Sequence, residues 1–420
     1  MRPESTWDVA VVGAGPAGSA AAFWLAKAGW RVVVAEQKHF PRPKTCGDGL
    51  TPRAVRQLVD MGLGSFLESK HKFRGLRAIA SNRSLELAWP PHPGLPSHGY
   101  VVERKVLDFA VAEAARAQGA HFLFGHRASP WLDENGELAG VLVEDGSSAR
   151  QLRLKASYVI VADGSNSRVG RELGAKRDKS LPLGLAQRGY WQTSRPADSW
   201  IESHLELADP SGRIIPGYGW VFPMGNGLAN VGIGVLSAPR GLNTNRLLAN
   251  FVASVKDRWG LSAEPVALPT GGKLPMGLSV RPVIGKRHLL VGDAAGSINP
   301  FNGEGIAYAY ETGRLAAWAV GHALARGDSA ALRLYAGALE DRLFSYYALG
   351  SRFLRLMEQP GVLRACLGIG MRSAAIMSRV LVVMANLPRP DRLGASELAY
   401  LALGQSAGWS TRSKLDAPLS

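Results

Sequence analysis

The sequence predicts an α/β protein: a Rossmann-like domain with an inserted antiparallel β-sheet domain and a C-terminal helical region. Three observations lead to this prediction. Residues 7–36 follow the order strand, glycine turn, helix, strand, as a dinucleotide-binding unit requires. Residues 181–274 alternate in polarity between Gly and Pro turns, which indicates an antiparallel sheet. From about Asp328 to Pro388 the apolar pattern is helical.

The N-terminal glycine turn suits a dinucleotide. Gly13 permits the tight turn, Gly15 has no side chain to block a pyrophosphate, and Gly18 lets helix and strand pack closely. The helical run Ser19–Ala28 follows, and free N–H groups at the helix start can bind a diphosphate. Glu36 can accept hydrogen bonds from a ribose diol. A glycine turn alone can be ordinary, but the flanking elements here agree with FAD or NAD binding. The predicted cofactor residues in this unit are Gly13, Gly15, Pro16, Ala17, Gly18, Glu36 and Gln37.

The composition narrows the class of protein. The chain has 420 residues and is 46% hydrophobic, enough for two or more cores. Its two cysteines, Cys46 and Cys366, argue against a disulfide framework and fit a reducing cytoplasm. No Cys or His cluster has metal-ligand spacing, so no metal is expected. The α/β unit starts almost at Met1 with no apolar segment before it, so no secretory signal is expected.

The chain is strongly basic, with a formal net charge of +15 and a pI of about 10. Such a surface attracts nucleic acid, anionic lipid or anionic substrates, although an Arg-rich proteome would give the same charge. Because no nucleic-acid motif accompanies the charge, we expect an anionic membrane surface as partner and no nucleic acid. No uncharged apolar run reaches about 18 residues, so no spanning helix is expected. The expected location is cytoplasmic, peripheral at the inner face of the cell membrane.

A loop rich in proline and glycine, residues 37–50, follows the first unit and cannot form a regular helix. A helix is expected from Thr51 or Pro52 through Met61. Cys46 lies in the loop. A free cysteine is commonly a small buried residue, but the position of this one, directly after a nucleotide-binding unit, favours a role in the site.

Residues 73–102 are expected to form short strands, and an alanine-rich helix follows. Arg104 stands at the start of that helix, where it can be a surface residue or can hold a phosphate or ribityl group of the cofactor. Beyond the helix we expect a strand pair, His121–Gly125 and Glu137–Val143, joined through the turn sequence Asp133–Gly136.

Two later apolar strands end in motifs that would face a ligand. Ala156–Ala162 ends in Asp163-Gly164, and the run that starts at His288 ends in Gly292-Asp293. Such residues at the carboxyl ends of strands face the ligand crevice of an open α/β sheet. Asp293 can bind a ribityl hydroxyl, and the backbone before a helix over Ile306–Ala325 can donate to a flavin carbonyl or a phosphate. The predicted residues are Asp163, Gly164, Gly292, Asp293, Gly303, Gly305 and Ile306.

Tyr218, Trp220 and Phe222 alternate, so they project from one face of a strand, either as core packing or as a pocket wall. In the C-terminal tail, arginines interrupt runs of Leu, Ile, Val and Met. This pattern fits an amphipathic helix pair that closes the fold, or a basic, apolar surface that lies on an anionic membrane. Cys366 is expected to pack there. The arginines are Arg352, Arg355, Arg364, Arg372 and Arg379.

The cofactor motifs together resemble those of the p-hydroxybenzoate-hydroxylase-like flavoproteins. Residues 41–49, PRPKTCGDG, resemble the cysteine loop of the geranylgeranyl reductase family, and residues 218–223, YGWVFP, resemble its YxWxFP motif. The longer family motif has a proline three residues before the tyrosine. Here Ile215 stands at that position and Pro216 follows, a local variation in the turn. The resemblance covers nearly the whole chain and is closest to actinobacterial members that look like menaquinone reductases.

The resemblance implies FAD as cofactor and the addition of two hydrogens across an isoprenoid C=C bond, foremost in the menaquinone side chain. Cys46 is then a candidate proton donor or positioning group, and Tyr218 a second candidate acid. Trp220 and Phe222 would pack against the prenyl chain, where their π faces favour developing positive charge. The implied catalytic residues are Cys46, Tyr218 and Trp220. Cys46, Gly47 and Arg104 join the cofactor residues, and the substrate residues are Gly49, Tyr218, Trp220, Phe222 and Pro300.

Two other interpretations remain open at the sequence level. An aromatic hydroxylase or halogenase can use the same FAD scaffold, although a halogenase usually shows WxWxIP where this chain has YGWVFP. A membrane-associated flavin electron carrier would need no alkene chemistry. No second glycine motif marks an NAD(P)H domain, so an external electron donor is possible beside the prenylated lipid or quinone substrate. The expected domains are FAD-binding (1–75, 100–180, 275–330), substrate-binding (76–99, 181–274) and C-terminal helical, with possible membrane contact (331–420).

Overall fold

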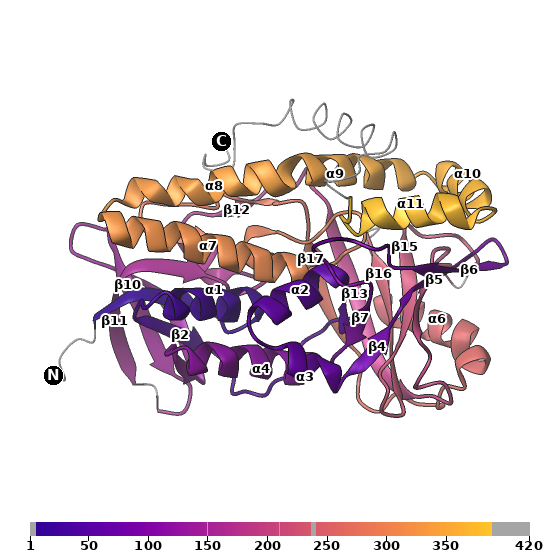
Figure 1. The fold of residues 1–420 in the computed structure, drawn as a ribbon, viewed down its shortest axis with the longest axis horizontal. Coiled ribbons are helices and arrows are strands. Elements are labelled where there is room, and N and C mark those ends of the chain that lie inside the picture. Colours follow the sequence, from indigo (N-terminus) through magenta and orange to yellow (C-terminus); the bar gives the residue numbers. More distant parts are fainter. Residues whose placement is uncertain (1–5, 149, 210, 237–240, 389–420) are drawn as a thin grey trace.

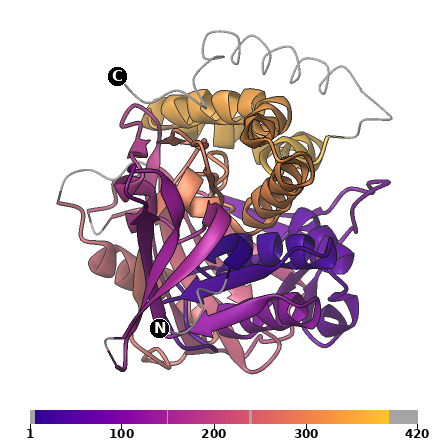
Figure 2. The ribbon, with the colours of Figure 1, turned by 90° about the vertical axis from the view of Figure 1, so that its left-hand side faces the viewer.

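The computed structural model describes residues 6–148, 150–209, 211–236 and 241–388. Two seven-stranded sheets lie side by side along the molecule, and helices flank both (Figure 1). In the view turned by 90°, the C-terminal helices lie together above the sheets (Figure 2). Residues 389–420 of the predicted C-terminal helical region lie outside the described part of the chain.

The first sheet contains the N-terminal strand, and its strand order is β8-β2-β1-β11-β10-β9, with β19 also paired to β11. Its central strands are continuous apolar runs, as parallel strands covered on both faces require. The long strand β11 pairs with β10 through its first half and with β19 through its last three residues. The strands are β1 (Thr6–Val12), β2 (Val32–Glu36), β8 (His121–Phe124), β9 (His126–Leu132), β10 (Leu138–Asp145), β11 (Gln151–Val161) and β19 (His288–Leu290).

Three long helices cover this sheet: α1 (Pro16–Lys27), α4 (Arg104–Ala117) and α7 (Ile306–Arg326). Helix α1 packs between the other two (Figure 1). A Cβ atom at Gly313 would lie 2.3 Å from the carbonyl oxygen of Ala17, so a glycine is needed where α7 meets α1. This close packing joins the N-terminal unit to a helix almost 300 residues later in the chain.

The second sheet has the order β17-β13-β16-β15-β14-β5-β6 and is antiparallel except for the parallel pair β14–β5. Helix α6 (Thr244–Trp259) covers one face. Odd-numbered side chains such as Val221 and Val231 pack against this helix, whereas the even-numbered Tyr218, Trp220 and Phe222 face the other way. The strands are β5 (Gly75–Ala80), β6 (Arg83–Ala88), β13 (Leu183–Gln192), β14 (Trp200–His204), β15 (Gly217–Pro223), β16 (Leu228–Val235) and β17 (Thr270–Pro275).

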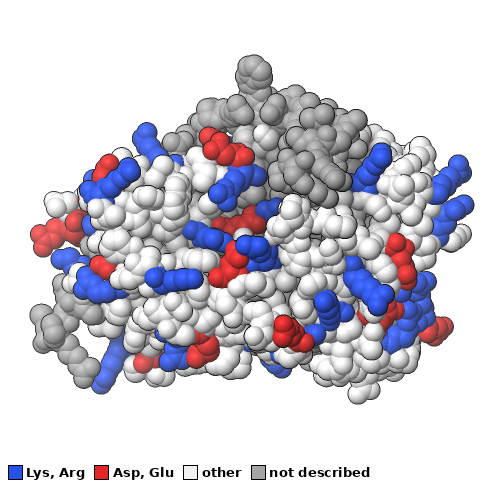
Figure 3. Space-filling view, viewed as in Figure 1, with Lys and Arg blue, Asp and Glu red and all other residues white. Residues whose placement is uncertain are grey.

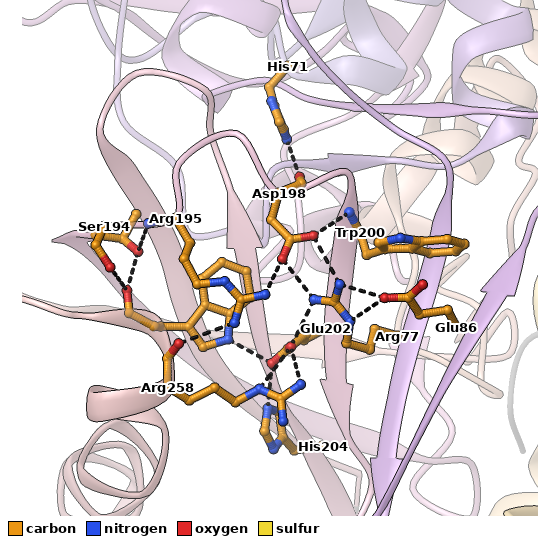
Figure 4. A network of polar contacts seen from close by, with 12 residues as sticks. His71, Arg77, Glu86, Ser194, Arg195, Asp198, Trp200, Glu202, His204 and Arg258 are labelled. Carbon is orange, nitrogen blue, oxygen red and sulfur yellow. Dashed lines mark hydrogen bonds and ion pairs between the residues drawn. The ribbon is translucent and has the colours of Figure 1, made fainter.

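A polar network joins α6 to β14 and β5 of this sheet (Figure 4). Glu202 of β14 is fully buried and accepts hydrogen bonds from Trp259 Nε1 at 2.7 Å, Arg258 Nη2 at 2.9 Å and Arg77 Nη1 at 3.1 Å. Arg77 also pairs with Asp198 at 2.9 Å and with Glu86 at 2.7 Å. The buried carboxylate is therefore compensated by donors from β5 and α6.

Smaller elements connect the two sheets and cover them. Helix α11 packs on β6, at the end of the molecule opposite the N-terminus (Figure 1). The small strands are β3 (Gly49–Leu50), β4 (His71–Phe73), β7 (Gly99–Val101), β12 (Lys176–Arg177) and β18 (Val280–Arg281). The remaining helices are α2 (Pro52–Asp60), α3 (Gly64–Glu68), α5 (Arg168–Glu172), α8 (Arg333–Leu339), α9 (Ser345–Met357), α10 (Pro360–Gly370) and α11 (Ala374–Met384), with short helical turns at Gly292–Ala295, Ser329–Leu332 and Glu340–Phe344.

Three local predictions were wrong. The strand pair expected from 121–125 and 137–143 does not form, because β8 lies beside β2 and the chain turns at Gly125 (φ +79°) into β9, which pairs with β10. Helix α6 was not expected within 181–274. Cys366 is exposed rather than packed, because it lies on the outer side of α10.

Candidate active site

A cavity of about 640 Å³ lies between the carboxyl edge of the first sheet and the open face of the second. It brings together residues that are up to about 300 positions apart in the chain. The predicted residues that line it from the first sheet and its helices are Gly13, Gly15, Pro16, Ala17, Glu36, Gln37, Cys46, Gly47, Arg104, Asp163, Gly164, Asp293, Gly303, Gly305 and Ile306. From the second sheet come Tyr218, Trp220 and Phe222.

Four predicted residues lie beside the cavity instead of lining it: Gly18, Gly49, Gly292 and Pro300. The reason is close packing. A Cβ atom at Gly18 would lie 1.9 Å from the Gly13 carbonyl oxygen, and one at Gly49 would lie 3.1 Å from the Phe222 ring. A Cβ atom at Gly292 would lie 2.8 Å from that of Ala17, and Pro300 packs against Gly350 of α9.

The start of α1 forms an open cradle for a diphosphate. Gly13 adopts φ +99°, and its Cβ atom would lie 2.5 Å from the Ala162 carbonyl oxygen. A Cβ atom at Gly15 would meet nothing nearer than Arg42 Nη2 at 3.9 Å, so the space beside its backbone is open to a ligand. No side chain caps α1, which leaves its first N–H groups available. Glu36 is held in place by Ala14 N at 2.9 Å.

Two carboxyl groups at the ends of β11 and β19 also suit a polyhydroxyl ligand. Asp163 Oδ1 is buried without a hydrogen-bond partner among the described residues. Asp293 lines the cavity, and burial raises the pKa of both carboxyls. Hydroxyl donors of a ribityl chain would satisfy such acceptors. With the diphosphate cradle, the residues present therefore fit FAD.

The cysteine loop lies against the open face of the second sheet. The Cys46 carbonyl oxygen accepts hydrogen bonds from Asn230 Nδ2 at 2.8 Å and from Arg188 Nε at 3.1 Å. Burial raises the pKa of the Cys46 thiol, although the nearby Arg104 guanidinium opposes this shift. Arg104 is itself buried and pairs with Asp108 at 2.7 Å, so it is not a surface residue.

The aromatic residues form a wall of the cavity, one of the two placements that their alternation allowed. The ring centroids of Tyr218 and Trp220 are 5.9 Å apart, and those of Trp220 and Phe222 are 6.2 Å apart. Tyr218 donates its hydroxyl hydrogen bond to the Asn302 carbonyl oxygen at 2.7 Å. Burial raises the pKa of this phenol well above its ordinary value. Leu236, Leu274 and Ile298 continue the lining with apolar surface.

Comparisons with known proteins agree with this geometry. Residues 6–229 match the FAD binding domain model, and residues 212–266 match the geranylgeranyl reductase catalytic domain model. The menaquinone reductase of Mycobacterium tuberculosis is 42% identical over 397 residues, which cover 93% of this chain and 94% of that protein. This chain belongs to the geranylgeranyl reductase family. It is an FAD-dependent oxidoreductase.

Solved structures agree with the fold of this geranylgeranyl reductase family member. A geranylgeranyl bacteriochlorophyll reductase-like protein of Thermoplasma acidophilum superposes with a TM-score of 0.75 at 25% identity, over 95% of this chain and 96% of the other. A flavin-dependent brominase also gives a TM-score of 0.75, at 17% identity over 96% and 99% of the two chains. The second likeness concerns the fold alone.

Several polar residues around the cavity were not anticipated from the sequence of this family member. Arg42 and Lys44 line it from the cysteine loop, and Arg188 lines it from β13. Asp48 and Asn230 lie directly behind Cys46. The sequence does carry one indication of these residues, because polar and small residues recur at every second position of β13 and β16. This spacing shows that they share one face of each strand, but which face lines the cavity is known only once the pairing partner of each strand is known.

Proposed function

We propose that this protein saturates a C=C bond of an isoprenoid chain, and that its substrate is the side chain of menaquinone. The observation that carries the proposal is the juxtaposition, in one cavity, of the FAD cradle, the Cys46 thiol and an aromatic wall. The identity to the mycobacterial menaquinone reductase over nearly the full chain supports the choice of substrate.

Bound FAD, once reduced, supplies the hydride equivalent. The residues of this chain then have to deliver a proton and bind an apolar chain. Since burial raises the pKa of the Cys46 thiol, its Sγ keeps a proton at neutral pH and can donate it to the second alkene carbon. The Tyr218 hydroxyl is the alternative donor, because its raised pKa also keeps it protonated.

The apolar part of the cavity suits the prenyl chain. Trp220 and Phe222 present ring faces, and Leu236 and Leu274 add aliphatic surface. Developing positive charge on a tertiary carbon would be favoured next to these π faces.

The test is mass spectrometry of lipid extracts from a host with and without the gene, focused on quinones. A gain of about 2 Da on the menaquinone side chain, the mass of the two hydrogens that a hydride and a proton add, would support the proposal. Unchanged quinones with hydrogenated glycerolipid chains or polyprenyl phosphates would keep the reductase and change the substrate. No change in any prenyl lipid would contradict the proposal.

A halogenase or aromatic hydroxylase is the second candidate, because such enzymes can use the same FAD scaffold; the likeness to the brominase shows this shared fold and no more. The YGWVFP sequence on β15 and the match to the geranylgeranyl reductase catalytic domain favour the reductase. Oxygen uptake in the presence of NAD(P)H distinguishes the two, because a hydroxylase or halogenase consumes oxygen.

We further propose that the protein works at an anionic membrane surface on the cytoplasmic side and receives electrons from an external donor. None of the described helices is long and apolar enough to cross a membrane. Helices α9–α11 expose the apolar side chains of Leu356, Ile369 and Ile376 close in sequence to exposed arginines. Basic side chains are visible in Figure 3 at the end of the molecule where α10 and α11 lie. Sedimentation with vesicles tests this: binding should require anionic lipid and fall when Arg364, Arg372 and Arg379 become Glu.

A further inference from the structure

Asn230 connects two parts of the candidate active site. Its side chain is fully buried on β16. The Oδ1 atom accepts a hydrogen bond from Trp220 Nε1 at 2.9 Å. The Nδ2 group donates to the Cys46 carbonyl oxygen and to Asp48 Oδ2, each at 2.8 Å. A single amide therefore links the aromatic wall to the cysteine loop across 184 positions of sequence.

Asp48 completes this link from the side of the loop. It is fully buried, adopts φ +64°, and accepts hydrogen bonds from Tyr190 Oη at 2.6 Å and from the Arg104 amide at 3.3 Å. Burial raises the pKa of this carboxyl to about 6, while the Tyr190 hydrogen bond and the Arg188 charge oppose the shift. At neutral pH the carboxylate is mostly ionised and can accept all three hydrogen bonds.

The strand register explains why these groups meet. Tyr190 on β13 and Phe222 on β15 both pair with Asn230 on the strand between them. One pleat along, Gly232 pairs with both Arg188 and Trp220. Because Gly232 has no side chain, the Trp220 ring lies across it and its Nε1 reaches the neighbouring Asn230.

We propose that Asn230 and Asp48 are positioning residues that hold the Cys46 thiol and the Trp220 ring at a fixed separation in the cavity. Neither side chain lines the cavity, so neither is expected to touch substrate or FAD. Their hydrogen bonds fix the carbonyl of Cys46 and the ring nitrogen of Trp220, which leaves both groups little freedom to move. The inference rests on the proposed role of Cys46 in the reaction.

The test measures how often the cysteine loop opens. In the FAD-loaded full chain with Cys366→Ser, Cys46 is the remaining thiol and is partly buried, so a loosened loop should expose it more and raise its rate of alkylation by iodoacetamide above that of the same chain without a further substitution. N230D keeps an oxygen for Trp220 but loses the donor to the Cys46 carbonyl and to Asp48. We expect alkylation at least about tenfold faster and kcat lower by about tenfold to a hundredfold, with KM changed less and FAD retained.

Three further variants separate positioning from general destabilisation. Y190F removes one hydrogen bond to Asp48 and should therefore also speed the alkylation of Cys46, but by less than N230D does. This variant keeps the test valid if N230D does not fold. D48N tolerates positive φ and keeps one acceptor oxygen for Tyr190 and Asn230, but its NH2 group cannot accept the hydrogen bond from the Arg104 amide, so it should also speed alkylation, by less than N230D. N250D is the matched control. Asn250 lies on α6, away from the cavity, and its Nδ2 donates a hydrogen bond to the Ala208 carbonyl oxygen at 3.1 Å, so the same substitution removes a similar bond outside the site.

The outcomes are distinct. Wild-type alkylation rates in both N230D and Y190F would overturn the inference, and so would equal acceleration in N250D. Faster alkylation in N230D, combined with normal turnover in Cys46→Ala, would support the positioning of the loop and refute the proposed catalytic role of Cys46.

Discussion

Replacement of Gly232 by alanine should displace Trp220. A Cβ atom at position 232 would lie 2.2 Å from Trp220 Cζ2, 2.5 Å from Cε2 and 2.7 Å from Arg188 Cβ. Carbon atoms in contact are normally about 3.5–4.0 Å apart, so the ring has to move by more than about 1 Å. Such overpacking costs about 1–3 kcal/mol, and loss of the hydrogen bond to Asn230 adds about 1 kcal/mol.

Gly234 provides the matched control on the same face of the same strand. A Cβ atom there would lie 3.7 Å from both Trp220 Cζ3 and Tyr218 Cε1, which is an ordinary contact. Each Gly→Ala substitution lowers the conformational entropy of the unfolded chain by the same amount. This entropic contribution to the free energy of unfolding therefore cancels when the two variants are compared. We therefore expect G232A to unfold with a free energy about 2–4 kcal/mol lower than G234A.

The two variants should also differ in turnover. Because a misplacement of about 1 Å in a site can reduce the rate about a hundredfold, G232A should reduce prenyl substrates about a hundredfold more slowly than wild type. G234A also adds a methyl group to the cavity lining but does not displace Trp220, so its turnover should fall less. Urea unfolding, FAD content and turnover are measured on both. Equal stability and equal turnover in the two variants would refute the contact between Gly232 and the Trp220 ring.

Three other perturbations follow from the structure. C46S should keep FAD but lower turnover, since the hydroxyl is a poorer acid than the thiol; unchanged turnover with tightly bound FAD would exclude a catalytic role. G18A should fold poorly or lose FAD, measured by flavin absorbance after gel filtration, because its Cβ atom would lie 1.9 Å from the Gly13 carbonyl oxygen. Burial opposes ionisation of Glu202, but hydrogen bonds from His204 and Trp259 and the charge of Arg258 lower its pKa to about 2. Because this pKa lies below the unfolded value, the stabilisation is present above about pH 4.5 and is lost as the pH falls. The free energies of unfolding of wild type and E202Q, measured by urea titration, should therefore differ by roughly 1.4 kcal/mol less at pH 3.5 than at pH 6. A difference that does not change with pH would contradict the lowered pKa of Glu202.

Local sequence patterns were enough to predict much of the fold. The order of apolar run, glycine turn and helix predicted β1, α1 and β2, because each of these elements depends on neighbouring residues. The carboxyl ends of β11 and β19 could also be placed at one edge of the sheet, because parallel strands end at the same edge.

The rest depended on pairing between distant strands. Whether Trp220 faces a core or a cavity is decided by the pairing of β15 with β16 and of β16 with β13, and this register cannot be read from the periodicity of one strand. In the sequence Asp48 is part of a glycine-rich loop with no sign of a special role. Its hydrogen bonds with Tyr190 and Asn230 depend on strands more than 140 residues later in the chain, so only the folded structure shows them. The predicted pairing of β8 with β10 was wrong because the turn at Asp133–Gly136 suited more than one partner strand: β10 pairs with β9, and β8 pairs with β2.

The insertion of β5 and β6 at the edge of the second sheet has a consequence for synthesis on the ribosome. Strand β5 pairs with β14, which is made more than 100 residues later, and α1 packs against α7, which is made almost 300 residues later. Neither half can bury its core until most of the chain has emerged. We expect the nascent chain to expose apolar strands for most of its translation, and its folding to be slow because the closing contacts are distant in sequence.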